Sequence, residues 1–273
     1  MPEHQLPLVL IPGIQGRAEY VAPARDALAA SFRVLAMPLG GEPGSTGRVD
    51  PARGVDDEVT FVMRELDCQG IDRAAICGIS YGGVVALRAA ACHPNRVAAL
   101  IMASTPGPDW RLTGRHVVYA RRPRLFGTLF ALETPGRLRA EVAAALPAAG
   151  RRLRFVLWHL GVLVRARLSY PRMADRAHAV EATDRRAACA AVTAPTLIVT
   201  GAPGLDRIIP EHGAEEYLPL IRGARHAILE RTGHIGSITR PDAFASLVRD
   251  FIERTIAPAP PRERSSENAD HAA

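Results

Sequence analysis

Four short apolar runs, separated by helical patterns, constrain the fold of this chain more than any other feature of its sequence. The runs cover residues 6–11, 32–38, 73–77 and 97–103. The stretch 56–67, which lies between two of them, repeats its apolar residues at helical spacing. Strands that alternate with helices at such short intervals indicate βαβ units and a parallel sheet. Because the runs are nearly continuous in apolar residues, we expect helices to cover both faces of this sheet.

The sequence Gly-Ile-Ser-Tyr-Gly-Gly at residues 78–83 joins the third apolar run to an Ala-rich helical stretch over 84–92. A serine flanked by glycine two residues away on each side, between strand and helix, is typical of a strained turn that exposes the hydroxyl group. The glycines let strand and helix cross closely, and the helix N-terminus supplies free N–H groups. A helix-capping serine in a Gly-rich turn is the alternative. Ser80 therefore needs partners elsewhere before it can be interpreted as a nucleophile.

The strand pattern stops near residue 110 and returns at residues 196–200. Helical patterns fill the interval, and they include 138–146 and 153–168. We therefore expect a helical cap over residues 110–190, inserted into a core made of residues 6–109 and 191–256. The charge changes at the same place, because residues 111–186 carry 16 arginines against 5 acidic residues, a balance of +11.

In the rest of the chain, the sequence pattern again predicts alternating helices and strands. We expect a helix near 211–221, a last strand over 227–230 and a closing helix over 241–252, with a proline in its first turn. Residues 257–273 are rich in Pro, Arg, Glu and Ser, and we expect them to form a disordered tail.

Two residues in the second half of the chain follow predicted strands, as Ser80 does. Asp206 lies in the loop after 196–200, and His234 lies just after 227–230. Side chains at the carboxyl ends of parallel strands share one edge of a sheet. A serine nucleophile needs a base that takes its proton and an acid that orients this base. His234 and Asp206 fill these roles in the sequence, and Asp109, which follows the fourth apolar run, is an alternative acid.

The order Ser80, Asp206, His234 resembles that of the α/β-hydrolase superfamily. The resemblance covers essentially residues 6–255 and depends on residues 78–82, the Asp206 loop ending in Ile-Ile-Pro, and Gly-His at 233–234. It implies an α/β-hydrolase fold, with a mostly parallel twisted sheet flanked by helices and a helical cap inserted after the strand at 97–103. It also implies that Ser80 is the nucleophile, His234 the general base and Asp206 its partner.

The same resemblance implies an oxyanion hole made of two backbone N–H groups. One belongs to Tyr81, directly after the nucleophile, and the other to Ile14 or Gln15 in the turn after the first apolar run. Many members of the superfamily have His-Gly in this turn, where this chain has Pro-Gly at 12–13. That departure concerns the geometry of the loop more than the chemistry.

The expected function is that of a serine hydrolase, esterase-like, which cleaves a small or medium carboxylic ester, lactone or thioester through an acyl-enzyme. Carbon–carbon bond hydrolysis, acyl transfer and perhydrolysis use the same triad and stay open. Serine at position 80 argues against the haloalkane dehalogenase and epoxide hydrolase branches, which use aspartate there. An alternative of another class is a ligand-binding protein that kept the fold and lost turnover.

Composition limits the partners. The four cysteines show no metal-binding spacing, and we expect neither a metal nor a cofactor. All 34 basic residues are arginine. We do not expect nucleic-acid binding, because the sequence shows no basic groove interleaved with aromatic residues. The N-terminus lacks a signal-peptide pattern and no apolar run reaches about 18 residues, so we expect a cytoplasmic protein that acts on a small-molecule substrate. The sequence leaves the oligomeric state open.

Residues 153–168 permit two interpretations. Six apolar residues fall on one helical face, with arginines at both ends: Leu153, Val156, Leu157, Leu160, Val164 and Leu168. Such a helix can lie in a membrane interface, or it can pack over the mouth of the active site and line an apolar acyl pocket. We favour packing over the mouth and keep peripheral membrane contact as the alternative. The basic cap would also steer an anionic substrate or a negatively charged surface.

Overall fold

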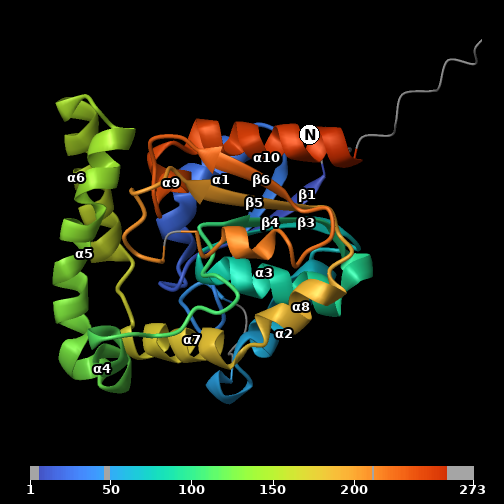
Figure 1. The fold of residues 1–273 in the computed structure, drawn as a ribbon, viewed down its shortest axis with the longest axis horizontal. Helices are drawn as coiled ribbons and strands as arrows, with labels where there is room; N and C mark the ends of the chain where they lie inside the picture. Colours follow the sequence, from blue (N-terminus) through green and yellow to red (C-terminus); the bar gives the residue numbers. More distant parts are fainter. Residues whose placement is uncertain (1–5, 46–49, 211, 257–273) are drawn as a thin grey trace, which may run out of the picture.

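The computed structural model describes residues 6–45, 50–210 and 212–256, so the tail predicted at 257–273 lies outside the described residues. Its centre is a six-stranded parallel sheet in the order β2-β1-β3-β4-β5-β6 (Figure 1). The strands are β1 (Pro7–Ile11), β2 (Arg33–Ala36), β3 (Ala74–Ile79), β4 (Val97–Ala103), β5 (Thr196–Gly201) and β6 (Arg225–Leu229). The predicted parallel α/β sheet is confirmed. Since β1 lies between β2 and β3, the connections diverge there, and a ligand site is expected beyond the carboxyl ends of these strands.

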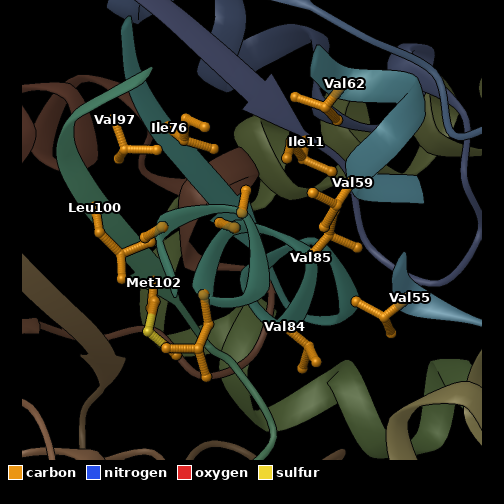
Figure 2. Packing of buried hydrophobic residues seen from close by; sticks show 14 of the residues in the cluster. Ile11, Val55, Val59, Val62, Ile76, Val84, Val85, Val97, Leu100 and Met102 are labelled. Carbon is orange, nitrogen blue, oxygen red and sulfur yellow. The ribbon is translucent and has the colours of Figure 1, made fainter. Parts of the chain in front are cut away.

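Helices cover both faces of the sheet. The helices α1 (Ala22–Leu28) and α10 (Pro241–Ile256) lie on one face, and α2 (Val55–Cys68), α3 (Tyr81–Cys92) and α8 (Arg185–Ala191) lie on the other. Alternate residues of β1 serve the two faces, because successive side chains of a strand point to opposite sides. Leu8 and Leu10 pack with α1 and α10, whereas Val9 and Ile11 pack with α2 and α3. Figure 2 shows the second cluster, around Ile11, Val59 and Val85.

The segment between β4 and β5 is helical, as predicted. It contains α4 (Arg115–Arg121), α5 (Pro123–Ala145), α6 (Ala149–Arg165) and α7 (Tyr170–Ala182), followed by α8. In Figure 1, α5 and α6 run along one side of the molecule. The core-and-cap division at 110–190 stays a prediction. Helix α8, which lies within the predicted cap, packs against α3 and adds Ala188 and Cys189 to the core. No helix formed by the described residues is both long and apolar enough to cross a membrane.

The structure overturns the favoured interpretation of residues 153–168. The apolar face that we expected over the mouth of the site is exposed, with 44–77% of Leu153, Val156, Leu157, Leu160 and Val164 accessible. Helix α6 contacts the rest of the protein through another face, on which Val162 and Ala166 pack against Tyr20. The Tyr20 hydroxyl donates a hydrogen bond to the Ala166 carbonyl at 3.1 Å. The helix is apolar on two sides, so periodicity alone could not tell which side packs.

The helix predicted near 211–221 is also wrong. The described part of that segment holds only a 3₁₀ turn at Glu215–Tyr217. Residue 219 is proline, which has no backbone N–H and so cannot donate the hydrogen bond that would continue a helix through this segment. The buried Tyr217 hydroxyl donates to the Pro106 carbonyl at 2.7 Å. This tertiary contact fixes the turn against the segment that follows β4.

Candidate active site

Ser80 is the single residue between β3, which ends at Ile79, and α3, which begins at Tyr81. Its φ of 54° lies in the left-handed region, which costs a non-glycine residue conformational energy. Two hydrogen bonds hold this conformation: Ser80 N–H donates to the Ala103 carbonyl at 2.8 Å, and Gly83 N–H donates to the Ser80 carbonyl at 2.9 Å. The turn therefore presents the serine side chain at the carboxyl edge of the sheet.

The glycines around Ser80 are required by close backbone approach. A Cβ atom on Gly78 would overlap the backbone of Gly82, and one on Gly82 would overlap the carbonyl of Ile11. Any larger residue would force β3, α3 and β1 apart. The Gly-x-Ser-x-Gly pattern thus reflects the sterics of the turn.

The structure brings the three residues singled out by the sequence into one chain of contacts. His234, between β6 and α9 (Gly236–Thr239), places Nε2 3.1 Å from Ser80 Oγ. Its Nδ1 lies 3.1 Å from Asp206 Oδ2, in the loop after β5. The other oxygen of Asp206 accepts hydrogen bonds from the backbone N–H groups of Ile208 at 2.8 Å and Ile209 at 3.2 Å. The loop backbone thus fixes the carboxylate while the imidazole bridges to the serine.

Electrostatics couple His234 to Asp206. Burial alone would raise the pKa of Asp206, but the charge of His234, the hydrogen bond to it and the N–H groups of Ile208 and Ile209 hold it below its ordinary value. Burial would lower the pKa of His234, yet the charge of Asp206, its hydrogen bond and the charge of Glu141 raise it. The site therefore keeps an ionised acid beside a base whose protonated form is stabilised.

The alternative acid, Asp109, is engaged elsewhere. It is exposed and pairs with Arg186, whose Nε lies 2.9 Å from Asp109 Oδ1. The Nδ1 atom of His234 has its carboxylate partner in Asp206. The geometry therefore favours Asp206 over Asp109 as the orienting acid.

The two backbone segments expected to bind an oxyanion lie beside Ser80. Tyr81 opens α3, so its N–H belongs to the first turn, where N–H groups lack intrahelical acceptors. The turn after β1 is closed by a hydrogen bond from Gly16 N–H to the Gly13 carbonyl at 2.9 Å. A Cβ atom built on Gly13 would lie 3.5 Å from Ser80 Cβ, so this turn, with Ile14, sits against the serine.

Arg176 of α7 supports that turn, and sequence reasoning missed it. Its guanidinium is buried and donates to the Ile14 carbonyl at 3.0 Å. It also forms an ion pair with Glu42 at 3.0 Å, and Glu42 pairs in addition with Arg172 at 3.1 Å. One arginine among many in a basic segment gives no sequence signal for this contact.

Glu141 of α5 was also missed. It is 1% exposed, and its Oε1 accepts a hydrogen bond from the backbone N–H of Ile235, next to His234, at 2.7 Å. Burial raises the pKa of this carboxyl to about 7. A second carboxyl group, carried by a helix between β4 and β5, thus holds the loop of the candidate base.

The residues described here offer no cluster of three or more His, Cys, Asp or Glu side chains placed to hold a metal ion. Ser80, His234 and Asp206, with backbone N–H groups nearby, are the groups that nucleophilic acyl chemistry uses.

Comparison with known proteins supports the fold and the class. Residues 8–247 match the model of the alpha/beta hydrolase family. The chain is 27% identical to a Variovorax paradoxus protein provisionally named carbamate hydrolase RutD, over 93% of this chain and 94% of that protein. It is 29% identical to the pimeloyl-[acyl-carrier protein] methyl ester esterase of Neisseria meningitidis, over 70% of this chain and 64% of that protein.

A solved structure is similar over nearly the same extent. The enol-lactonase from Burkholderia xenovorans LB400 superposes with a TM-score of 0.69 at 26% identity, covering 91% of this chain and 92% of that one. Because the family model matches most of the chain and the fold agrees, the protein is an enzyme of the alpha/beta hydrolase family.

Proposed function

We propose that this protein is a serine hydrolase that cleaves a carboxylic ester, lactone or thioester through an acyl-enzyme. The observation that carries the proposal is the imidazole of His234, which lies 3.1 Å from both Ser80 Oγ and Asp206 Oδ2. This arrangement gives a hydroxyl nucleophile a base and gives the base an orienting anion. A turn with a merely capping serine would need neither partner.

In the proposed reaction, His234 Nε2 takes the proton of Ser80 as Oγ attacks the carbonyl carbon. The N–H groups of Tyr81 and Ile14 bind the oxyanion, and one such donor is worth about 3–4 kcal/mol of barrier in serine hydrolases. His234 then gives its proton to the leaving oxygen or sulfur. A water molecule, deprotonated by the same imidazole, releases the acid and restores Ser80.

The proposed substrate class is supported by what the similar proteins are named to act on. One is a methyl ester esterase, and another is an enol-lactonase. Both names describe an acyl carbon bonded to an oxygen leaving group, which is the bond that the proposed mechanism breaks. We expect acyl length and the shape of the leaving group to be selected from the side of α5 and α7, which contact the loops of His234 and Ile14.

A fluorophosphonate probe and a substrate panel test this function. We expect the probe to label the folded protein once, at the peptide that contains Ser80, and we expect turnover of p-nitrophenyl esters or lactones. Failure to label would reject the serine mechanism and favour a ligand-binding protein. Labelling without turnover of any ester, lactone or thioester would favour carbon–carbon bond hydrolysis, acyl transfer or perhydrolysis.

Glu141→Gln should move the pH profile of kcat/KM. The negative charge of Glu141 favours protonated His234, and this charge develops near pH 7, where burial places the pKa of Glu141. Glutamine can still accept the hydrogen bond of Ile235 but carries no charge. The pKa of His234 should therefore fall, its neutral form should persist to lower pH, and the acid limb should shift to lower pH.

The matched control for this variant is Glu133→Gln. Glu133 lies on the same helix, is partly buried and pairs with Arg115 and Arg137. We expect its profile to match the wild type. An unshifted acid limb in Glu141→Gln, with kcat lowered equally at every pH, would assign Glu141 a purely structural role.

A further inference from the structure

The sides of α5 and α6 that face away from the protein body carry two apolar stripes. The stripe of α5 comprises Leu125, Leu129 and Leu132, and the stripe of α6 comprises Leu153, Val156, Leu157, Leu160 and Val164. Among the described residues, eleven large apolar side chains are exposed, and eight of them belong to these two stripes. Exposed apolar residues scattered singly are normal, but a concentration on two consecutive helices marks an interaction surface.

Helical geometry shows that the stripes point outward. Residues nine positions apart lie on opposite sides of an α-helix, since each residue advances by about 100°. Leu132 is nine residues before Glu141, which reaches the His234 loop, and Leu153 is nine residues before Val162, which packs against Tyr20. Both helices run along one side of the molecule (Figure 1). Each stripe is therefore the free face of a helix whose other face holds it to the protein.

Exposed arginines bracket both stripes. Residues 115–167 contain 11 arginines and 2 acidic residues. The two acids are engaged, because Glu133 pairs with Arg115 and Arg137 and Glu141 is buried. Exposed guanidinium groups lie at the start of α5 and at both ends of α6: Arg121, Arg122, Arg124, Arg151, Arg154, Arg165 and Arg167. The surface thus combines aliphatic stripes with an uncompensated positive charge.

This combination indicates which kind of partner binds the surface of α5 and α6. A second copy of the chain would bring two arginine-rich surfaces together, at a cost in like-charge repulsion. An anionic bilayer satisfies both parts of the surface, because its acyl boundary accepts aliphatic side chains and its phosphates attract guanidinium groups. We propose that α5 and α6 bind the surface of an anionic phospholipid membrane, with the two apolar stripes in the headgroup–acyl boundary. The proposal is independent of the reaction at Ser80.

Vesicle sedimentation with the full chain tests this inference. We expect the protein to sediment with vesicles of phosphatidylcholine and phosphatidylglycerol, and to remain in the supernatant with phosphatidylcholine alone. Added salt should reduce binding to the anionic vesicles. The double variant Leu157→Glu/Leu160→Glu should lose this binding. Ile256→Glu, which alters an exposed apolar residue at the end of α10, should retain it.

Charge variants separate the electrostatic part. Arg151→Gln/Arg154→Gln should weaken partition onto anionic vesicles by about fivefold for each arginine removed, which corresponds to about 1 kcal/mol per residue. Every variant should give the same circular dichroism spectrum as the wild type. Equal binding to both vesicle types would overturn the proposal of an anionic partner. Absence of vesicle binding, with a dimer that Leu157→Glu/Leu160→Glu dissociates, would assign the stripes to a second copy.

Discussion

Replacing Ser80 with alanine should lower kcat by about 10⁶-fold, with little change in the free energy of unfolding. Removal of the nucleophile from a serine hydrolase triad costs this much, because the remaining groups cannot form the acyl-enzyme. The hydrogen bonds that fix the turn use the backbone of residue 80, so they persist in the variant. Steady-state hydrolysis of the best ester in the panel, together with thermal unfolding, measures both quantities.

Ser31→Ala provides the control for this variant. Ser31 precedes β2 and lies at the amino end of the sheet, opposite to the candidate site. Its replacement should leave kcat within a factor of about two, as expected of a substitution remote from the site. If Ser80→Ala retained more than a small fraction of the wild-type activity while folded, Ser80 would not be the nucleophile.

Asp206→Asn should lower kcat by about 10⁴-fold at neutral pH, as the same change does in a serine protease triad. The asparagine oxygen can still accept the N–H groups of Ile208 and Ile209, so the loop should keep its shape. Its amide group, however, can donate to His234 Nδ1. This donation favours the tautomer that carries its proton on Nε2, which cannot accept the proton of Ser80.

Asp109→Asn is the matched comparison, because it removes the alternative acid. That change breaks an exposed pair with Arg186, and an exposed ion pair contributes little to stability. We expect its kcat to equal that of the wild type. A large loss in Asp109→Asn, with activity kept in Asp206→Asn, would reverse the assignment of the acid.

Local patterns were sufficient for the sheet and for the positions of the candidate triad. The central strands β1, β3 and β4 are short and apolar because both of their faces are buried, and this composition is visible without tertiary information. Ser80, Asp206 and His234 each follow a strand, and parallel strands bring their carboxyl ends to one edge. Glycine is required at 78 and 82, because β3 and α3 cross so closely that a Cβ atom at either position would overlap backbone atoms.

The sequence could not determine what the inserted helices contact. Arg176 is one of 34 arginines. It donates a hydrogen bond to the Ile14 carbonyl because of where α7 lies relative to the turn after β1. Glu141 occupies an ordinary helical position, and only the approach of α5 to the His234 loop buries it. Helix α6 has two apolar sides, and the contact with Tyr20 decides which of them is covered. Periodicity reports which side chains share a face, whereas the partner of that face is fixed by contacts between residues far apart in the chain.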